Sequence, residues 1–189
     1  MKLVGVIVML LLQIGCAGGA AHVGERNPGR PSSRTTWYKV ETFATGDLSK
    51  KDVLEVKSSD SGESVSVDTL RMTKQIFNSD GFKTDGKGSV IVEVSHDVKA
   101  PGINIGILIP YTHMLTVRVN KGGTALWMAR VECPSEYPGR QVTIAQMLTV
   151  LRPFIGSSSG GQKSISMKED DERVIELLSK KSEPEALAK

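Results

Sequence analysis

Residues 111–133, YTHMLTVRVNKGGTALWMARVEC, are the stretch that decides the fold. Apolar and polar residues alternate on both sides of the NKGG sequence at 120–123, and this pattern predicts two half-buried strands joined by a tight turn. The apolar series of the second strand is Ala125, Trp127, Ala129, Val131 and Cys133. We therefore expect an antiparallel hairpin with one apolar face.

The same alternation predicts a further strand just before this hairpin. Val90, Val92, Val94 and Val98 place their side chains on one face, and a Gly/Pro loop follows at 99–102. An earlier β-branched and aromatic stretch, TTWYKVETF at 35–43, also predicts a strand. Between them, residues 46–62 are mostly polar, with a short apolar break at 53–56.

Two helices are predicted on either side of the strands at 90–133. The first begins after Ser66, a suitable N-cap, with Asp68 in its first turn. It ends at Gly81, and Phe82 is placed to fold back on the last turn. The second contains Thr143 and Gln146 as a capping box, with Val142 and Met147 as the hydrophobic staple. Its apolar face is Ile144, Met147, Leu148 and Leu151, and Pro153 disfavours helix at Arg152, so the regular part should end there.

These elements together predict the fold class. We expect an α+β domain over residues 35–155, with an antiparallel sheet of about four to five strands and two helices packed on one face. A length of 189 residues suits one such domain with flanking segments. The predicted core comprises Val92, Val94, Leu115, Val117, Trp127, Ile144, Leu148 and Leu151.

Composition and motifs argue against several function classes. The net charge of +3 and the absence of a basic stripe with interleaved aromatic residues give no support to nucleic-acid binding. The GKGS sequence at 86–89 lacks the spacing of a phosphate-binding loop and precedes a strand, so we interpret it as a turn. The sequence contains no nucleophile elbow, Cys-x-x-Cys or His-Glu-x-x-His motif, and it implies no cofactor.

His96, His113 and Cys133 form the one constellation with chemical potential. Each lies in the apolar series of its own strand. If these three strands pair in the order of the sequence, the three side chains would share one sheet face near one end. Two imidazoles and a thiolate are ligands that suit zinc or copper. The spacing matches no known ligand motif, however, and we expect two partly buried histidines and an inert thiol rather than a metal site.

The first 34 residues are predicted to be a secretory signal peptide followed by a flexible tether. Lys2 precedes an apolar run at 3–12, and small residues follow, as in a secretory signal peptide over residues 1–15. The run is too short to span a bilayer; a short membrane anchor and a buried core segment are the alternatives. Residues 16–34 are rich in Gly, Ala, Pro and Ser, which suits a flexible tether.

The Gly15-Cys16 step after aliphatic residues resembles the lipobox of bacterial lipoproteins. That resemblance implies that Cys16 receives diacylglycerol and becomes the mature N-terminus. Because the residue after the cysteine is Ala17 rather than Asp, the resemblance also favours the outer membrane over the inner. Gln13 stands where lipoproteins prefer Leu, Val or Ile, so ordinary signal cleavage near residues 18–21 is the alternative.

Residues 156–189 are expected to be a Gly/Ser spacer followed by a charged, marginally helical tail. Val174, Leu177 and Leu178 form a narrow apolar stripe, with acidic residues at 169–172 in front. This tail is either a solvated helix or a docking peptide for an envelope protein. The irregular loop from Cys133 to residue 139 is either a rigid connector or a second recognition surface.

The layout of residues 37–155 resembles small bacterial envelope lipoproteins that carry an uncharacterised α+β domain of unknown function. The residues that carry the resemblance are Cys16, Gly81-Phe82, Leu126-Trp127 and the helix at 143–151. It implies a lipid-anchored, palmitoylated, periplasm-facing protein with this fold, and it implies no mechanism. Our leading hypothesis is a non-enzymatic accessory or interaction module. The alternative is a soluble periplasmic protein that binds a small ligand or a metal.

Overall fold

The structure is a computed structural model that describes residues 35–60, 65–84, 86–104, 107–135, 141–168 and 170–179. A six-stranded sheet has the strand order β2-β3-β6-β7-β1-β8, and β4 and β5 form a separate two-stranded hairpin. The strands are β1 (Thr35–Ala44), β2 (Leu54–Ser58), β3 (Val90–Lys99), β4 (Gly102–Asn104), β5 (Ile107–Ile109), β6 (Tyr111–Lys121), β7 (Thr124–Ser135) and β8 (Lys163–Lys168). The helices are α2 (Val67–Ser79), α3 (Gln141–Leu151), a 3-10 turn at Arg152–Phe154, and α4 (Glu172–Ser179).

The α+β class is confirmed, and the sheet is larger than predicted. The predicted strands pair antiparallel as expected, β3 with β6, β6 with β7 and β7 with β1. β2 pairs with β3 in parallel, and β8 pairs with β1 in antiparallel orientation. The described part of the chain therefore has six strands in the main sheet rather than four to five, and three α-helices rather than two.

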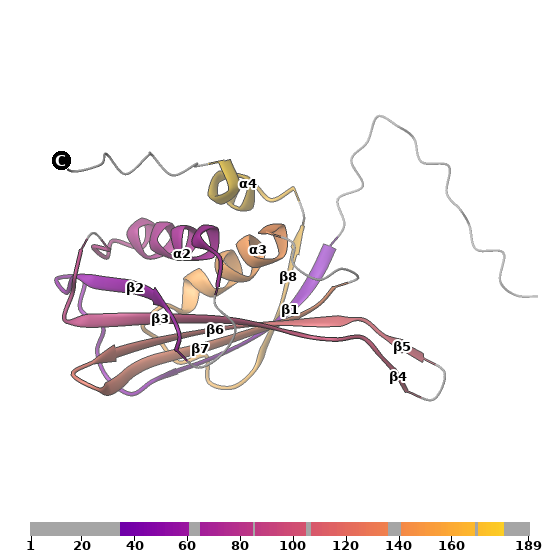
Figure 1. The fold of residues 1–189 in the computed structure, drawn as a ribbon, viewed down its shortest axis with the longest axis horizontal. Helices are drawn as coiled ribbons and strands as arrows, with labels where there is room; N and C mark the ends of the chain where they lie inside the picture. Colours follow the sequence, from indigo (N-terminus) through magenta and orange to yellow (C-terminus); the bar gives the residue numbers. More distant parts are fainter. Residues whose placement is uncertain are drawn as a thin grey trace, which may run out of the picture. The chain divides into compact units, whose positions relative to one another are not determined.

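The core lies between the sheet and the helices, which cover one face of it (Figure 1). All eight predicted core residues are at most 7% exposed. Trp127 packs edge-on against Phe77 of α2, and its indole nitrogen donates a hydrogen bond to the Ser157 carbonyl at 3.0 Å. Ala125 is exposed, contrary to the prediction, because the β6–β7 register shifts between Val119 and Asn120.

The ends of α2 are as predicted. The Ser66 hydroxyl accepts a hydrogen bond from the Thr69 amide at 3.2 Å. At the other end, the Phe82 amide donates to the Phe77 carbonyl at 3.0 Å, the two rings meet edge-to-face, and Gly81 has a φ of +90°. This is the Schellman arrangement, in which glycine adopts the left-handed conformation without a side-chain clash.

The predicted start of α3 is wrong. The helix begins at Gln141, so Thr143 and Gln146 lie inside it rather than at its N-terminus. Gln146 is buried, and its side-chain oxygen accepts a hydrogen bond from the Tyr38 hydroxyl at 2.6 Å. The end of the helix is confirmed: regular helix stops at Leu151, and the turn containing Pro153 follows.

The chain after Ile155 belongs to the fold, where we had expected a spacer and a tail. Ser159 exchanges hydrogen bonds with the backbone of Thr42, and the Ser158 hydroxyl accepts one from the Ala44 amide. β8 then pairs with β1, and α4 buries Val174 and Leu177. The folded unit thus extends to Ser179.

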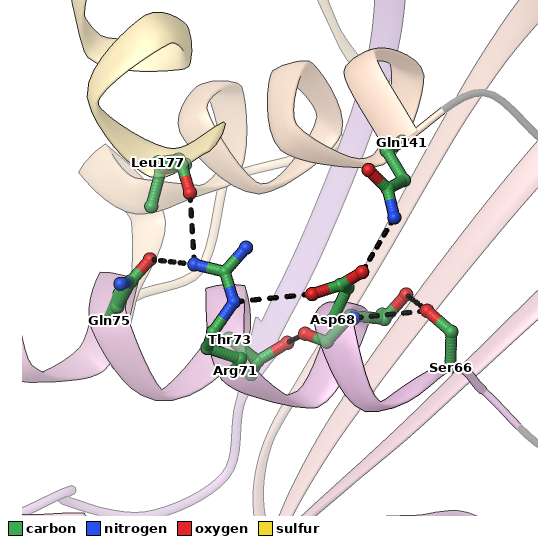
Figure 2. A network of polar contacts seen from close by, with 8 residues as sticks. Ser66, Asp68, Arg71, Thr73, Gln75, Gln141 and Leu177 are labelled. Carbon is green, nitrogen blue, oxygen red and sulfur yellow. Dashed lines mark hydrogen bonds and ion pairs between the residues drawn. The ribbon is translucent and has the colours of Figure 1, made fainter. Parts of the chain in front are cut away.

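A polar network joins the three helices (Figure 2). The Arg71 guanidinium of α2 donates to the Leu177 carbonyl of α4 and to the Gln75 amide oxygen, each at 3.2 Å. It also pairs with Asp68, whose other oxygen accepts from the Gln141 side chain of α3 at 2.6 Å. These contacts fix α3 and α4 against α2.

Candidate functional site

His96, His113 and Cys133 share the core face of the sheet, as the sequence predicted. Each alternates with buried neighbours on its own strand, and His113 lies directly opposite Cys133 in the β6–β7 register. They lie near the end of the sheet at which β3 ends and β6 begins. We call this the arm end, because the β4–β5 hairpin, the arm, joins those two strands there.

The two histidines contact each other. His96 Nε2 and His113 Nδ1 are 3.0 Å apart, a hydrogen bond in which one nitrogen donates and the other accepts. The rings are stacked, with centroids 5.2 Å apart and planes inclined by 21°. His113 is fully buried, whereas His96 is partly exposed.

His96 resists protonation. Burial lowers the pKa of His96 below its ordinary value of 6.5, and the neighbouring His113 lowers this pKa further, while Asp97 raises it in part. Two imidazolium rings cannot keep the bond, because both facing nitrogens would then carry a proton. The arrangement therefore requires that at least one ring stays neutral.

Cys133 is a buried free thiol that lies opposite His113 on the neighbouring strand. Burial raises the pKa of its thiol to about 12, so the nucleophilic thiolate is scarce at neutral pH. Among the residues that the structure describes, no group of three or more His, Cys, Asp or Glu side chains is placed to hold a metal ion. The three residues share a face, and the two histidines are hydrogen-bonded to each other.

The other predicted site residues have separate outcomes. Cys16 and loop residues 136–139 lie outside the described residues. Val174 and Leu177 of the tail helix are buried in the core, so these two side chains are already covered within the chain.

A hollow on the opposite face of the sheet is a feature that sequence analysis missed. It lies beside β1 near the arm end, has a volume of about 370 Å³, and is bordered by Trp37, whose side chain is 61% exposed. The sequence pattern that could have predicted the exposed Trp37 is the alternation of inward and outward side chains along β1. Because Tyr38 and Val40 are buried, Trp37 points outward. The other lining residues are Tyr38, Lys39, Thr112, Glu132, Cys133, Pro134 and Ser164.

None of the helices in the described ranges is long and apolar enough to cross a membrane.

Comparisons with known proteins show distant structural likeness. No family model matches the chain. No curated protein matches it either. A PDZ domain protein from Parabacteroides distasonis is 8% identical with a TM-score of 0.48; the match covers 71% of this chain and 39% of that one.

Two crystal forms of the PelC dodecamer from Paraburkholderia phytofirmans are also similar. One is 13% identical with a TM-score of 0.42, covering 64% of this chain and 98% of that one. The other is 9% identical with a TM-score of 0.44, covering 65% and 99%. At this distance none of these proteins assigns a family or a function to the chain.

Proposed function

We propose that the chain is a non-enzymatic lipoprotein of the bacterial cell envelope, anchored by lipid on Cys16, whose α+β domain is an accessory or interaction module. The observation that carries the proposal is the N-terminal sequence, in which a short apolar run ends at Gly15-Cys16. A diacylated cysteine supplies two acyl chains, which is the two-signal condition for stable membrane anchoring. Ala17 favours the outer membrane, facing the periplasm.

The chemistry of the domain supports a non-enzymatic role. The two histidines are hydrogen-bonded to each other, and the raised pKa of Cys133 keeps its thiol protonated at neutral pH. Neither arrangement provides the base and activated nucleophile that covalent catalysis uses. We propose an envelope protein as the partner, through the loop at 133–139 or the outer side of α4, where Ile175 is 52% exposed.

The test is fractionation of cells that express the wild type or Cys16→Ser, with N-terminal mass spectrometry of the wild type. We expect the wild type in the membrane fraction with a lipid mass on Cys16, and the variant in the soluble periplasmic fraction with its domain folded. Cys133→Ser is the matched control, because it removes the other cysteine and should leave the protein at the membrane.

The alternative is a soluble periplasmic protein that binds a small ligand or a metal. The hollow beside Trp37 favours it, because ligand sites are concave and combine apolar surface with a few polar groups. A wild-type N-terminus at Ala20, Ala21 or His22 without lipid would contradict the anchored form and put this alternative first.

A further inference from the structure

The two edges of the main sheet differ in how they are covered. β2 forms one edge and β8 the other. At the β2 edge, Val53 forms a bridge with Lys83, and the Leu54 amide donates a hydrogen bond to the Lys83 carbonyl at 2.7 Å. Within the described ranges, residues 163–167 of β8 have backbone partners on β1 alone. β8 is therefore the open edge, and an open edge is a template for pairing with another chain.

The hydrogen bonds of β1 show which backbone groups of β8 are open. The Thr45 amide continues the ladder of β1 and donates to a carbonyl of β7 at 2.9 Å. Successive residues of a strand direct their amide and carbonyl groups to opposite sides, so the even-numbered residues of β1 bond to β8. Tyr38 is opposite Ile165, which therefore bonds to β1. Ser164 and Ser166 direct their amide and carbonyl groups to the open side.

The side chains of this edge leave room above the sheet. Ser164 and Ser166 are exposed, and they lie opposite Lys39 and Trp37 of β1. Ser164 and Trp37 both line the hollow of about 370 Å³. Because the two serines are small, a large apolar side chain on an added strand would lie over them and reach the exposed ring of Trp37. Strand addition draws its specificity from such sites for alternate side chains.

The charges along β8 indicate the chemistry of the partner. Lys163 and Lys168 are exposed at its two ends, and Lys39 is opposite Ser164. None of these three lysines has an ion pair among the described residues, and β8 contains no acidic residue. An acidic segment is therefore complementary to this edge.

A second copy of the chain is a poor partner for the same edge. In-register antiparallel pairing of two β8 strands would place Lys163 of one copy opposite Lys168 of the other. Like charges that are directly opposite each other destabilise a pair of strands. The lysines thus disfavour pairing of β8 with itself and favour a different polypeptide.

We propose that β8 is a docking edge for an extended, acidic segment of another polypeptide, which adds to the sheet as a further strand. The added strand bonds to the backbone groups of Ser164 and Ser166, and a large apolar side chain at its centre lies against Trp37. Acidic residues at its two ends face Lys163 and Lys168. This inference rests on the proposed role as an interaction module, and it gives that role a surface and a partner chemistry.

The first test measures the binding of synthetic peptides to the purified full chain. The probe is a fluorescein-labelled peptide with Phe at the centre of alternating Val and Thr, and with Glu at both ends; a matched peptide has Lys at both ends. By fluorescence anisotropy, we expect the Glu-ended peptide to bind about tenfold more tightly or better. Combined Lys163→Glu and Lys168→Glu should reverse this preference. Equal affinity of the two peptides for the wild type would overturn the proposal.

The second test separates backbone pairing from charge attraction. Ser166→Pro removes an amide hydrogen on the open side and leaves the bonds to β1 in place, as prolines of edge strands do. We expect this variant to bind the Glu-ended peptide about tenfold more weakly. Ser166→Ala, which keeps the amide, should bind like the wild type, and the Tm of both variants reports folding. Wild-type affinity in a folded Ser166→Pro variant would argue that no strand is added.

Hydrogen exchange of the wild type gives a measurement that requires no variant. The Glu-ended peptide should slow exchange of the Ser164 and Ser166 amides, whereas the Ile165 amide, already bonded to β1, is the internal control. If the Ser164 and Ser166 amides are protected before peptide is added, another part of the chain or a second copy covers the edge, and the proposal is wrong. Dependence of that protection on protein concentration distinguishes these two covers.

The lipid anchor is tested apart from the docking edge. N-terminal mass spectrometry reports the state of Cys16 and does not depend on peptide binding. Lipidated protein that binds neither peptide would keep the proposed membrane location and overturn this inference. Protein without lipid that binds the Glu-ended peptide selectively would contradict the anchor and retain the docking edge.

Discussion

Burial of His96, together with the neighbouring His113, makes the domain sensitive to acid. Because the folded pKa of His96 lies below 6.5, the unfolded chain takes up a proton that the folded chain resists. The free energy of unfolding therefore falls as the pH drops below about 6.5, until the folded pKa is reached. We expect His96→Gln to flatten this fall below about pH 6.5, as measured by urea unfolding at several pH values.

The histidine pair also defines the control for this experiment. Asp97→Asn removes the charge that raises the pKa of His96, so the pH dependence of this variant should be equal to or steeper than that of the wild type. A wild-type stability that is flat over the same range, or that rises in acid, would show that His96 does not titrate as its surroundings imply.

Leu148 tests how α3 packs on the sheet. Its side chain is 1% exposed on the helix face that meets the core. Leu148→Ala should lower the free energy of unfolding by about 2–5 kcal/mol, because the cavity is only partly refilled. Val67→Ala, at a position that is 81% exposed, should change it by less than about 0.5 kcal/mol. Denaturant unfolding of both variants checks the difference, and similar values would argue against the packing of α3.

At the scale of the elements, the sequence predicts strands and helices whose neighbours lie nearby in the chain. β6, β7 and α2 carry clear alternation or caps, and all three form as predicted. β8 carries only Ile165 and Met167 as apolar residues, because it is an edge strand that pairs on one side with β1. A pattern so short cannot show that its partner lies at the other end of the chain.

The start of α3 shows a different difficulty. Thr143 and Gln146 have the spacing of a capping box, yet their side chains are buried because the helix begins earlier. A capping box and a buried position inside the helix give the same local sequence pattern. Only the tertiary contact between Gln146 and Tyr38 shows that Gln146 belongs to the helix interior. The same reasoning applies to the site: shared strand faces placed His96 and His113 together, but the sequence did not predict that their rings bond.

α4 gives a paired prediction with an internal control. Leu177 is 7% exposed, and its backbone carbonyl accepts a hydrogen bond from Arg71, whereas Ile175 is 52% exposed. Leu177→Ala should lower the free energy of unfolding by about 2–5 kcal/mol, and Ile175→Ala should have a far smaller effect. If thermal unfolding shows equally small losses of stability for both variants, α4 is a solvated tail and is not packed on the domain.

At the scale of the whole molecule, the first and last strands of the described chain are neighbours. β1 lies between β7 and β8, so Thr35 pairs with Lys168 and Val40 with Lys163. These contacts have the longest sequence separation in the sheet. They form only when β1 and β8 are both present and paired. The described C-terminal elements are thus part of the cooperative unit rather than an appendage.

Truncation after Ile155 tests this conclusion. The shortened chain lacks β8 and α4, leaves the Trp127 indole nitrogen without its Ser157 acceptor, and exposes Tyr38 and the outer side of α3. β8 buries Met167, and α4 buries Val174 and Leu177. At about 2–5 kcal/mol for each large buried side chain, their loss is comparable to the stability of about 5–15 kcal/mol that is typical of a domain. We therefore expect no cooperative thermal unfolding. A chain that ends at Ser179 keeps every contact described and should unfold like the full chain; a cooperative 1–155 chain with an unchanged Tm would show that the domain ends where the sequence alone placed its boundary.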